Sequence, residues 1–290
     1  MKKASAAIFI VFIGGGPSPQ VPVPKTNESN HWREKHPEWI FCDDFESESP
    51  LVDEGRYFEY NANSGGFIPE NGAGVNGSRG MRARWQKGEV EAGNLKLAFG
   101  KVPDKYLDKG IRRGEIFRDI YYRMYLKMQP GWEGNPYKLS RATVLCSANW
   151  SQAMIAHLWQ NSGDGLGIDP ASGTNDSGKV VTRQYNDFSK LKWLGAKHGT
   201  APIFNKQNAG KWHCIEAHVR LNDPGKSNGI QEFWCDGVLQ ARSDSLNFTK
   251  GFTDYGINAI FFENHWNDGA LKTEERYFDN IVVSTKRIGF

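Results

Sequence analysis

Apolar and polar residues alternate most regularly between Trp212 and Gly237. In the first half of this stretch, the apolar residues Ile215, Ala217, Val219 and Leu221 alternate with Cys214, Glu216, His218 and Arg220. In the second half, Phe233 and Cys235 alternate with Glu232, Trp234 and Asp236. A period of two predicts a strand with one face on a core, and the turn residues at 222–229 separate the two runs. We therefore predict a hairpin with one apolar and one polar face.

Short strand-like runs recur along the rest of the chain, whereas long helical periodicity is nearly absent. The runs lie at 39–45, 80–85, 94–99, 118–128, 144–146, 154–160, 180–185, 257–263 and 277–284. Many short strands separated by Gly, Asn and Pro turns predict an all-β sandwich or barrel. A folded length of about 250 residues suits a jelly-roll sandwich of two antiparallel sheets.

Two of these runs and the hairpin at 212–237 carry aromatic and charged side chains on the face opposite the apolar one. The residues are Tyr121, Arg123, Tyr125 and Lys127; His157 and Trp159; and Glu216, His218, Arg220, Glu232 and Trp234. A single charge on an outer face is usually just solvated, but tryptophan and histidine recur here together with the charges. If these strands share a sheet, we expect one cationic, aromatic groove that suits a carbohydrate.

The start of the chain has the pattern of a secretory signal. Lys2 and Lys3 precede a short apolar run at 6–13, which is too short to span a bilayer. A segment rich in Pro, Ser and Asn follows. We predict a signal peptide at 1–20, a linker at 21–38 and a single folded domain at 39–290, in a secreted or periplasmic protein without a membrane partner after export.

Charge and cysteine content narrow the classes of function. The net charge is +3 over 290 residues, and basic runs or glycine-rich phosphate loops are absent, which argues against a nucleic-acid partner. A mildly basic surface suits an acidic polymer. The four cysteines, Cys42, Cys146, Cys214 and Cys235, form no C-x-x-C pair. Two disulfides or four buried thiols both remain open.

Three segments resemble the concanavalin A-like jelly roll of lectins and glucanases. They are Phe41 to Glu46, the hairpin at 212–237, and Tyr277 to Val283. Within that fold, the chain is most similar to polysaccharide lyases of the alginate- and glucuronan-lyase type, families 14 and 20. Matching positions are Tyr122-Arg123 with Tyr125, Lys138, and His157 to Trp159. The similarity spans most of 39–290, although the Gly-Gly-Lys-Leu-Pro-Gly segment of family 14 is reduced to Tyr-Lys-Leu-Ser-Arg.

The resemblance implies β-elimination on a uronic-acid polymer. This reaction needs a base for the proton next to the carboxylate, a cation for the carboxylate, and an acid for the leaving oxygen. We assign the catalytic roles to His157 as base, Tyr125 as acid, and Arg123 and Lys138 as carboxylate partners, with His218 and Arg220 as alternatives. The expected substrate-binding residues are Tyr121, Lys127, Trp159, Glu216, His218, Arg220, Glu232 and Trp234.

Two other functions remain open. A non-catalytic lectin-like or laminin-G-like module would use the same groove and aromatics. A glycoside hydrolase of this fold needs two neighbouring carboxylates, and the nearest approach is Glu232 with Asp236. No cofactor is expected to be required. Glu46 and Asp279 lie in segments that adjoin and bind calcium in similar jelly rolls, so the resemblance makes them candidate ligands of a structural calcium ion. That they cap turns or pair with Arg or Lys remains open. The expected partner is an acidic polysaccharide, and the protein is expected to be a monomer.

Overall fold

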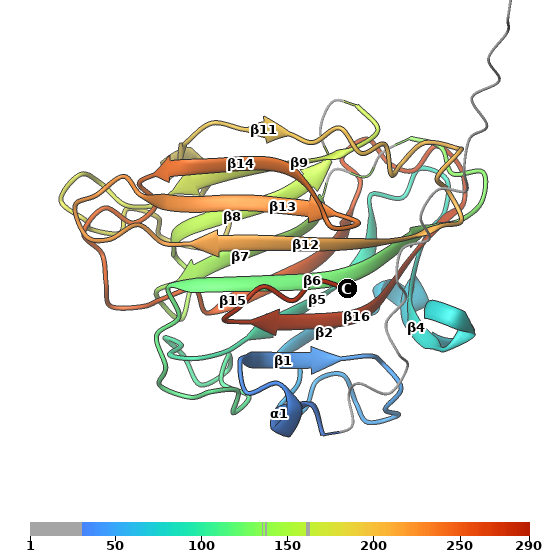
Figure 1. Cartoon of the computed structure of the whole chain (residues 1–290), viewed down its shortest axis with the longest axis horizontal. Helices are drawn as coiled ribbons and strands as arrows, with labels where there is room; N and C mark the ends of the chain where they lie inside the picture. Colours follow the sequence, from blue (N-terminus) through green and yellow to red (C-terminus); the bar gives the residue numbers. More distant parts are fainter. Residues whose placement is uncertain (1–30, 135, 137, 161–162) are drawn as a thin grey trace, which may run out of the picture.

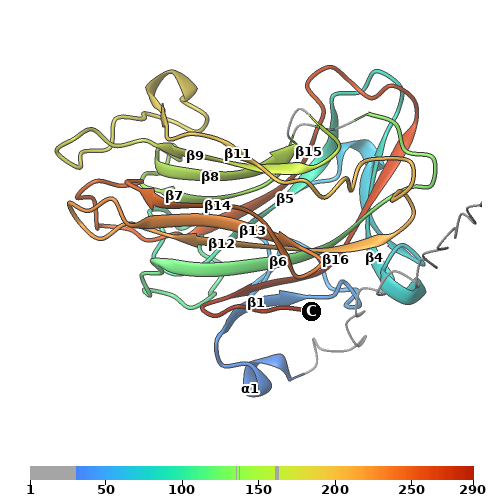
Figure 2. The same cartoon turned by 45° about the horizontal axis from the view of Figure 1, so that its top comes forward.

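The computed structural model describes residues 31–134, 136, 138–160 and 163–290. The predicted signal peptide and most of the predicted linker lie outside these residues. The fold is a sandwich of two antiparallel sheets that are stacked face to face (Figure 1 and Figure 2). This architecture confirms the predicted all-β jelly roll, in which the long strands bury an apolar face against the opposite sheet.

Sheet I contains eight strands. In order they are β14 (Val238–Leu246), β13 (Gly229–Cys235), β12 (Trp212–Arg220), β6 (Asp119–Met128), β16 (Glu274–Ser284), β4 (Arg79–Trp85) and β3 (Phe67–Asn71), with β1 (Trp39–Asp43) also paired to β16. Sheet I faces the viewer in Figure 1.

Sheet II also contains eight strands. In order they are β10 (Lys192–Trp193), β9 (Leu166–Ser172), β8 (Gln152–Gln160), β7 (Lys138–Leu145), β15 (Ala259–His265), β5 (Glu91–Ala98) and β2 (Glu59–Asn61), with β11 (Lys197–His198) also paired to β9. The helical elements are the short helix α1 (Trp32–Lys35) and the 3-10 turns η1 (Asn63–Gly65), η2 (Val75–Gly77) and η3 (Phe188–Lys190).

The core lies between the sheets and uses the predicted apolar faces. Ile215 and Ala217 of β12 and Met124 of β6 are buried there, as are Met154 and Leu158 of β8. The predicted alternation along the hairpin is therefore confirmed, as is its turn: β12 ends at residue 220 and β13 begins at 229.

Two of the sequence-based assignments differ from the structure in kind. The run at 180–185 is not a strand: it forms a single bridge between Thr174 and Val180 and otherwise crosses the surface as a loop. The end of the predicted linker is folded, because Trp32 of α1 is 6% exposed and packs with Trp39 and Val282. One buried indole is enough to attach this short helix to the edge of sheet I.

The predicted single groove is wrong. Strands β6, β12 and β13 belong to sheet I, whereas β8 belongs to sheet II. Their polar faces point outward on opposite sides of the sandwich, with the core between them. Alternation identifies which residues of a strand face a core, but both sheets of a sandwich share that core. The pattern therefore cannot assign a strand to one sheet.

No disulfide joins any two of the four cysteines, all of which lie among the described residues. Cys214 and Cys235 lie on the neighbouring strands β12 and β13 but on opposite faces, as the alternation predicts, with Cys235 in the main core. Among the residues that the structure describes, no helix is long and apolar enough to cross a membrane.

Candidate functional site

The outer face of sheet II gathers an unusual set of ionisable side chains, here called the polar face. Cross-strand pairing places Lys138 beside both Trp159 and His265, and it places His157 between Arg141 and Asp169. Residues paired across an antiparallel ladder share a face. The polar face comprises Lys138, Arg141, His157, Trp159, Asp169, Glu263 and His265.

His157 lies near the centre of the polar face and is a neutral base. Its Nδ1–H donates to the backbone oxygen of Asp169 over 3.1 Å, because a carbonyl oxygen can only accept. Its Nε2 therefore carries the lone pair, and this buried atom has no hydrogen-bond partner among the described residues. Burial, together with the charge of Arg141, holds the pKa of His157 well below its usual value. A buried imidazole with a free lone pair is suited to accept a proton.

Aromatic rings stack in a row from His157 to the surface. The ring of His157 lies 4.1 Å from that of Trp159 and 5.5 Å from that of Trp193, and Phe188 continues the row at 6.3 Å from Trp193. Trp193 is 42% exposed and Phe188 is 40% exposed, so the row ends at the surface. The exposed lysines Lys190, Lys192 and Lys197 lie in the same segment.

Arg141 is fixed by a network of its own. Its guanidinium is fully buried and donates to the carboxylate of Glu263, the hydroxyl of Tyr185 and the side-chain oxygen of Asn186. The Glu263 carboxylate keeps the pKa of Arg141 above its usual value in spite of burial. Arg141 is therefore a fixed cation of the polar face whose charge is paired with Glu263, with Nε left without a partner among the described residues.

Lys138 and Asp169 both have shifted pKa values. Burial, with a contribution from the charge of Arg141, lowers the pKa of the Lys138 ammonium, which Glu263 and Glu91 partly oppose. Burial raises the pKa of Asp169 to about 6. Oppositely shifted groups on one surface are typical of acid and base pairs in catalytic sites.

The outer face of sheet I holds the other predicted residues in a different arrangement. The C-terminal segment lies across this face, as Figure 1 shows for the chain end over β6 and β16. The N–H groups of Ile288 and Gly289 donate to the Glu216 carboxylate at 2.7 and 3.2 Å, and Arg123 donates to the Gly289 oxygen at 3.2 Å. The Arg287 guanidinium lies 4.2 Å from the ring of Trp234. Glu216, Arg123 and Trp234 are thus occupied by the chain itself.

The remaining predicted residues of sheet I are also engaged. His218 bridges Asp119 and Glu232, and Glu232 pairs with Arg242 as well, while Tyr121 stacks on His218 at 4.0 Å. Lys127 lies between the rings of Trp212 and Tyr277. Tyr125 is fully buried beside Val75 and Cys214, and Arg220 ends β12 half-buried.

The predicted catalytic set is therefore divided between the two sheets. His157 and Lys138 share the polar face of sheet II with Trp159, but Arg123 and Tyr125 lie on the far side of the core. Glu232, on β13 of sheet I, is likewise on the opposite side of the core from the polar face. The structure brings Arg141, Asp169, Glu263 and Trp193 to His157 instead, and sequence reasoning missed all four. The interleaving of lysine and aromatic residues at 188–193 is a signal that could have drawn attention to Trp193, but no comparable signal marks the other three.

The two carboxylates at the predicted calcium position both accept hydrogen bonds from the loop at 75–79. Asp279 Oδ2 accepts the N–H of Val75 at 2.7 Å and the hydroxyl of Ser78 at 3.3 Å, and Glu46 Oε1 accepts the N–H of Arg79 at 2.9 Å. Asp44 Oδ2 is buried without a partner among the described residues. Burial raises the pKa of Asp279 to about 7, and the charge of Asp44 adds to this shift. These hard oxygen donors fit a calcium ion.

A second cluster of residue types that can bind metals has a structural role. His213, Cys235 and Asp236 place their donor atoms within 4.8 Å of one another. Asp236, however, accepts the N–H of Cys214 and contacts Nδ1 of His213, both at 2.8 Å, at the turn that follows β13. These contacts tie the turn to β12.

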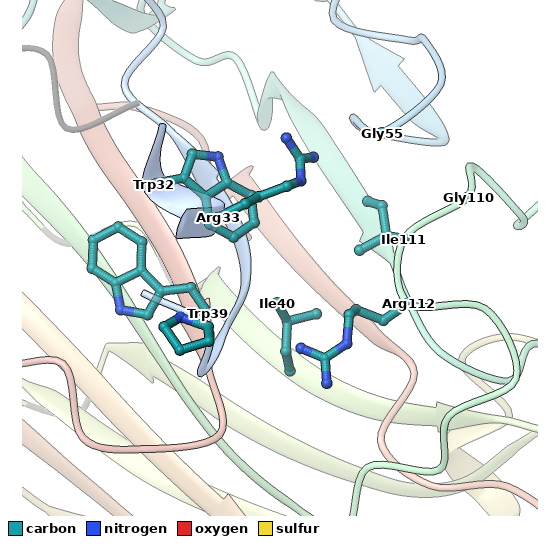
Figure 3. A pocket seen from close by; sticks show the side chains of 9 residues that line it. Trp32, Arg33, Trp39, Ile40, Gly55, Gly110, Ile111 and Arg112 are labelled. Carbon is teal, nitrogen blue, oxygen red and sulfur yellow. The ribbon is translucent and has the colours of Figure 1, made fainter. Parts of the chain in front are cut away.

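A pocket of about 300 Å³ lies apart from the polar face (Figure 3). Trp32 and Trp39 form one side, and Ile111 and Arg112 approach from the other. Its lining contains no member of the polar face, and it belongs to the seam between the α1–β1 segment and the loops at 55 and 110.

Solved structures of polysaccharide lyases share this fold. An endo-β-1,4-glucuronan lyase from the fungus Trichoderma reesei matches with a TM-score of 0.56 and 11% identity, covering 86% of this chain and 96% of that one. Alginate lyase vAL-1 from Chlorella virus matches at 0.52 and 13% identity, covering 75% and 88%, and alginate lyase Aly36B at 0.51 and 8%, covering 86% and 98%. No family model and no curated protein matches the chain. The protein therefore has the jelly-roll fold of the glucuronan and alginate lyases, as the resemblance in its sequence predicted.

Proposed function

We propose that this protein is a polysaccharide lyase that cleaves a uronic-acid polymer by β-elimination on the polar face of sheet II. The observation that carries the proposal is His157: a neutral imidazole with a free Nε2, surrounded by Lys138, Arg141 and stacked aromatic rings. Glucuronan and alginate are the substrates named for proteins of the same fold, and both are uronic-acid polymers. The chemistry of the face suits that class of polymer.

In this mechanism Lys138 binds the uronate carboxylate, while Arg141 stays paired with Glu263 beside it. Neutralising the carboxylate makes the adjacent C5 proton more acidic. Nε2 of His157 removes that proton, the C5–H electron pair becomes the C4–C5 double bond, and the C4–O glycosidic bond breaks. The leaving oxygen takes a proton from Asp169, whose raised pKa keeps part of the population protonated near pH 6.

Access to His157 requires movement of Trp193. His157 is 2% exposed, and the rings of Trp159 and Trp193 stack beside it at 4.1 and 5.5 Å. Trp193 lies on the two-residue strand β10, which pairs only with β9, and Gly195 follows with a positive φ of 103°. A strand this short opens at low free-energy cost. Trp193 can then exchange its contact with His157 for a sugar ring.

The test is to incubate the protein with polyglucuronate, polymannuronate and polyguluronate and to follow the ultraviolet absorbance of the unsaturated product. A neutral polymer such as cellulose serves as the substrate control. Product from at least one uronate is expected, and His157→Gln should form it about 10²- to 10⁴-fold more slowly. Absence of product from every uronate at high enzyme concentration contradicts the proposal.

A non-catalytic carbohydrate-binding protein is the second candidate, and the burial of His157 and Arg141 favours it. In that case the exposed rings of Trp193 and Phe188, with Lys190 and Lys192, bind an acidic polysaccharide without cleavage. Calorimetric binding of oligouronates in the absence of any product identifies this function. We further propose that the protein is exported and monomeric, and that Glu46, Asp279 and Asp44 hold a structural calcium ion.

A further inference from the structure

Arg276 of β16 is a buried cation on the inner side of the sandwich. Its neighbours across the ladders, Met128 and Ala83, both belong to the core, and its own side chain is fully buried. Burial lowers its pKa to about 9, and no carboxylate in the described ranges forms an ion pair with it. Burying a guanidinium without a counter-charge costs free energy. Its hydrogen bonds must offset that cost, so they identify the part of the fold that Arg276 stabilises.

The Arg276 side chain reaches across the core from sheet I to sheet II. Its Nη2 donates to the backbone oxygens of Glu263 at 2.7 Å and of Lys138 at 3.3 Å. Nη2 and Nε also donate to Oδ1 of Asn264, at 2.7 and 3.2 Å. Asn264 in turn donates from Nδ2 to the oxygen of Gly93 at 3.1 Å. One guanidinium therefore connects β7, β15 and β5.

The hydrogen bonds of Arg276 are made where β7 and β15 change their pairing register. The pairing of β7 with β8 shifts between Lys138 and Ser140, and the pairing of β15 with β5 shifts between Glu263 and His265. In a regular strand, two residues three positions apart point to opposite faces, so Lys138 and Arg141 would be separated. The extra residue in β7 brings both to the polar face. A bulge re-aims a side chain in this way but leaves local backbone groups without ladder partners.

We propose that Arg276 is a positioning residue, which holds the bulges of β7 and β15 from the core side and thereby aims Lys138 and Glu263 at the polar face. It touches no substrate and acts only through the Lys138 and Glu263 carbonyls and the Asn264 amide. The role of Lys138 toward a uronate rests on the proposed function. Its placement by Arg276 does not, because the contacts exist in the free protein.

The placement can be measured at the Lys138 ammonium without substrate. Lysine acetylation with limiting acetic anhydride is followed against pH by peptide mass mapping in the wild type, Arg276→Met, Arg276→Lys and Asn264→Ala. The groups that face Lys138 are Glu263 and His265 of β15, Arg141, His157 and Glu91. The wild-type Lys138 is expected to titrate below the exposed lysines, and Arg276→Met is expected to move its midpoint upward toward theirs.

Arg118→Met is the matched control. Arg118 is only partly buried, but its pKa is likewise lowered by burial, and it donates to the backbone oxygen of Asn222, away from β7 and β15. It should lower the melting temperature but leave the Lys138 titration unchanged. If Arg276→Met does not fold, Arg276→Lys and Asn264→Ala remain, since each weakens the same contacts while keeping the site polar.

Activity provides a second measurement. Removing such a supporting contact typically costs about 10- to 100-fold, here expected mainly in kcat and partly restored in Arg276→Lys. A wild-type Lys138 titration in both Arg276→Lys and Asn264→Ala overturns the inference, as does an equal shift in Arg118→Met. If the wild type cleaves no uronate, the proposed function fails, but the titration still decides the role of Arg276.

Discussion

The Nδ1–H of His157 donates to the backbone oxygen of Asp169, its neighbour across the β8–β9 ladder, over 3.1 Å. This hydrogen bond selects the tautomer with a lone pair on Nε2. A side-chain partner could rotate away, but a strand carbonyl cannot, so the base is oriented by the sheet itself. The polar face of sheet II is thus built around one imidazole whose protonation state the fold determines.

The first prediction concerns this imidazole and pH. The pKa of His157 is held below its usual value, so the base should stay deprotonated, and kcat/KM should not decline, until the pH falls well below about 6.5. His157→Gln should lower kcat by about 10²- to 10⁴-fold. A pH–rate profile in the wild type tests the first point. A profile that declines below pH 6.5, as for an ordinary histidine, contradicts it.

The same shift has a consequence for stability. The unfolded chain binds a proton at His157 near pH 6.5, whereas the folded protein does not, so stability should decrease as the pH falls below about 6.5. Urea denaturation at a series of pH values measures this slope. His157→Gln should reduce the slope in that window, and His31→Gln, at an exposed histidine, should not.

Asp169 should set the opposite limb of the activity profile. Burial raises its pKa to about 6, so the protonated acid is depleted as the pH rises through that value, and kcat/KM should decrease above it. Asp169→Asn removes the acid and should lower kcat by about 10²-fold or more. Wild-type activity in this variant would assign the proton to another group, of which Tyr185 is the nearest alternative on Arg141.

Trp193 should act in substrate binding. Its exposed indole stacks in the row that leads to His157, so Trp193→Ala should raise KM for long uronates by about tenfold, in line with the loss of one stacking contact. Leu239→Ala removes a similarly exposed apolar side chain from β14 of sheet I and serves as the control. Initial rates on polymer and on short oligomers separate this effect from a change in kcat.

Calcium should stabilise the protein through Asp279. The raised pKa of about 7 means that bound calcium must displace a proton, so the rise in melting temperature on adding calcium should be larger at pH 8 than at pH 6. Asp279→Asn should abolish that rise, and Glu48→Gln, at an exposed carboxylate near Glu46, should not. An identical melting temperature with calcium and with chelator at pH 8 argues against the site.

The hairpin at 212–237 shows what hydrophobic periodicity can predict and what it cannot. Its alternation correctly predicted the faces of Ile215 and Glu216, because burial of one face is a local requirement of each strand. It could not show that the C-terminal segment covers Glu216, since that contact joins residues more than seventy positions apart. The same limit explains why Asp169 and Trp193 were missed: each becomes notable only beside His157.

The sequence by itself determined the class of fold and the polar and apolar faces of its strands, because both follow from alternation, turn residues and the residues shared with jelly-roll lyases. Only the tertiary structure decided which faces belong together. It placed Lys138 and His157 on one sheet and Arg123 and Tyr125 on the other, across the core. The physical reason is that strand order depends on long-range pairing, and a two-residue period carries no information about it.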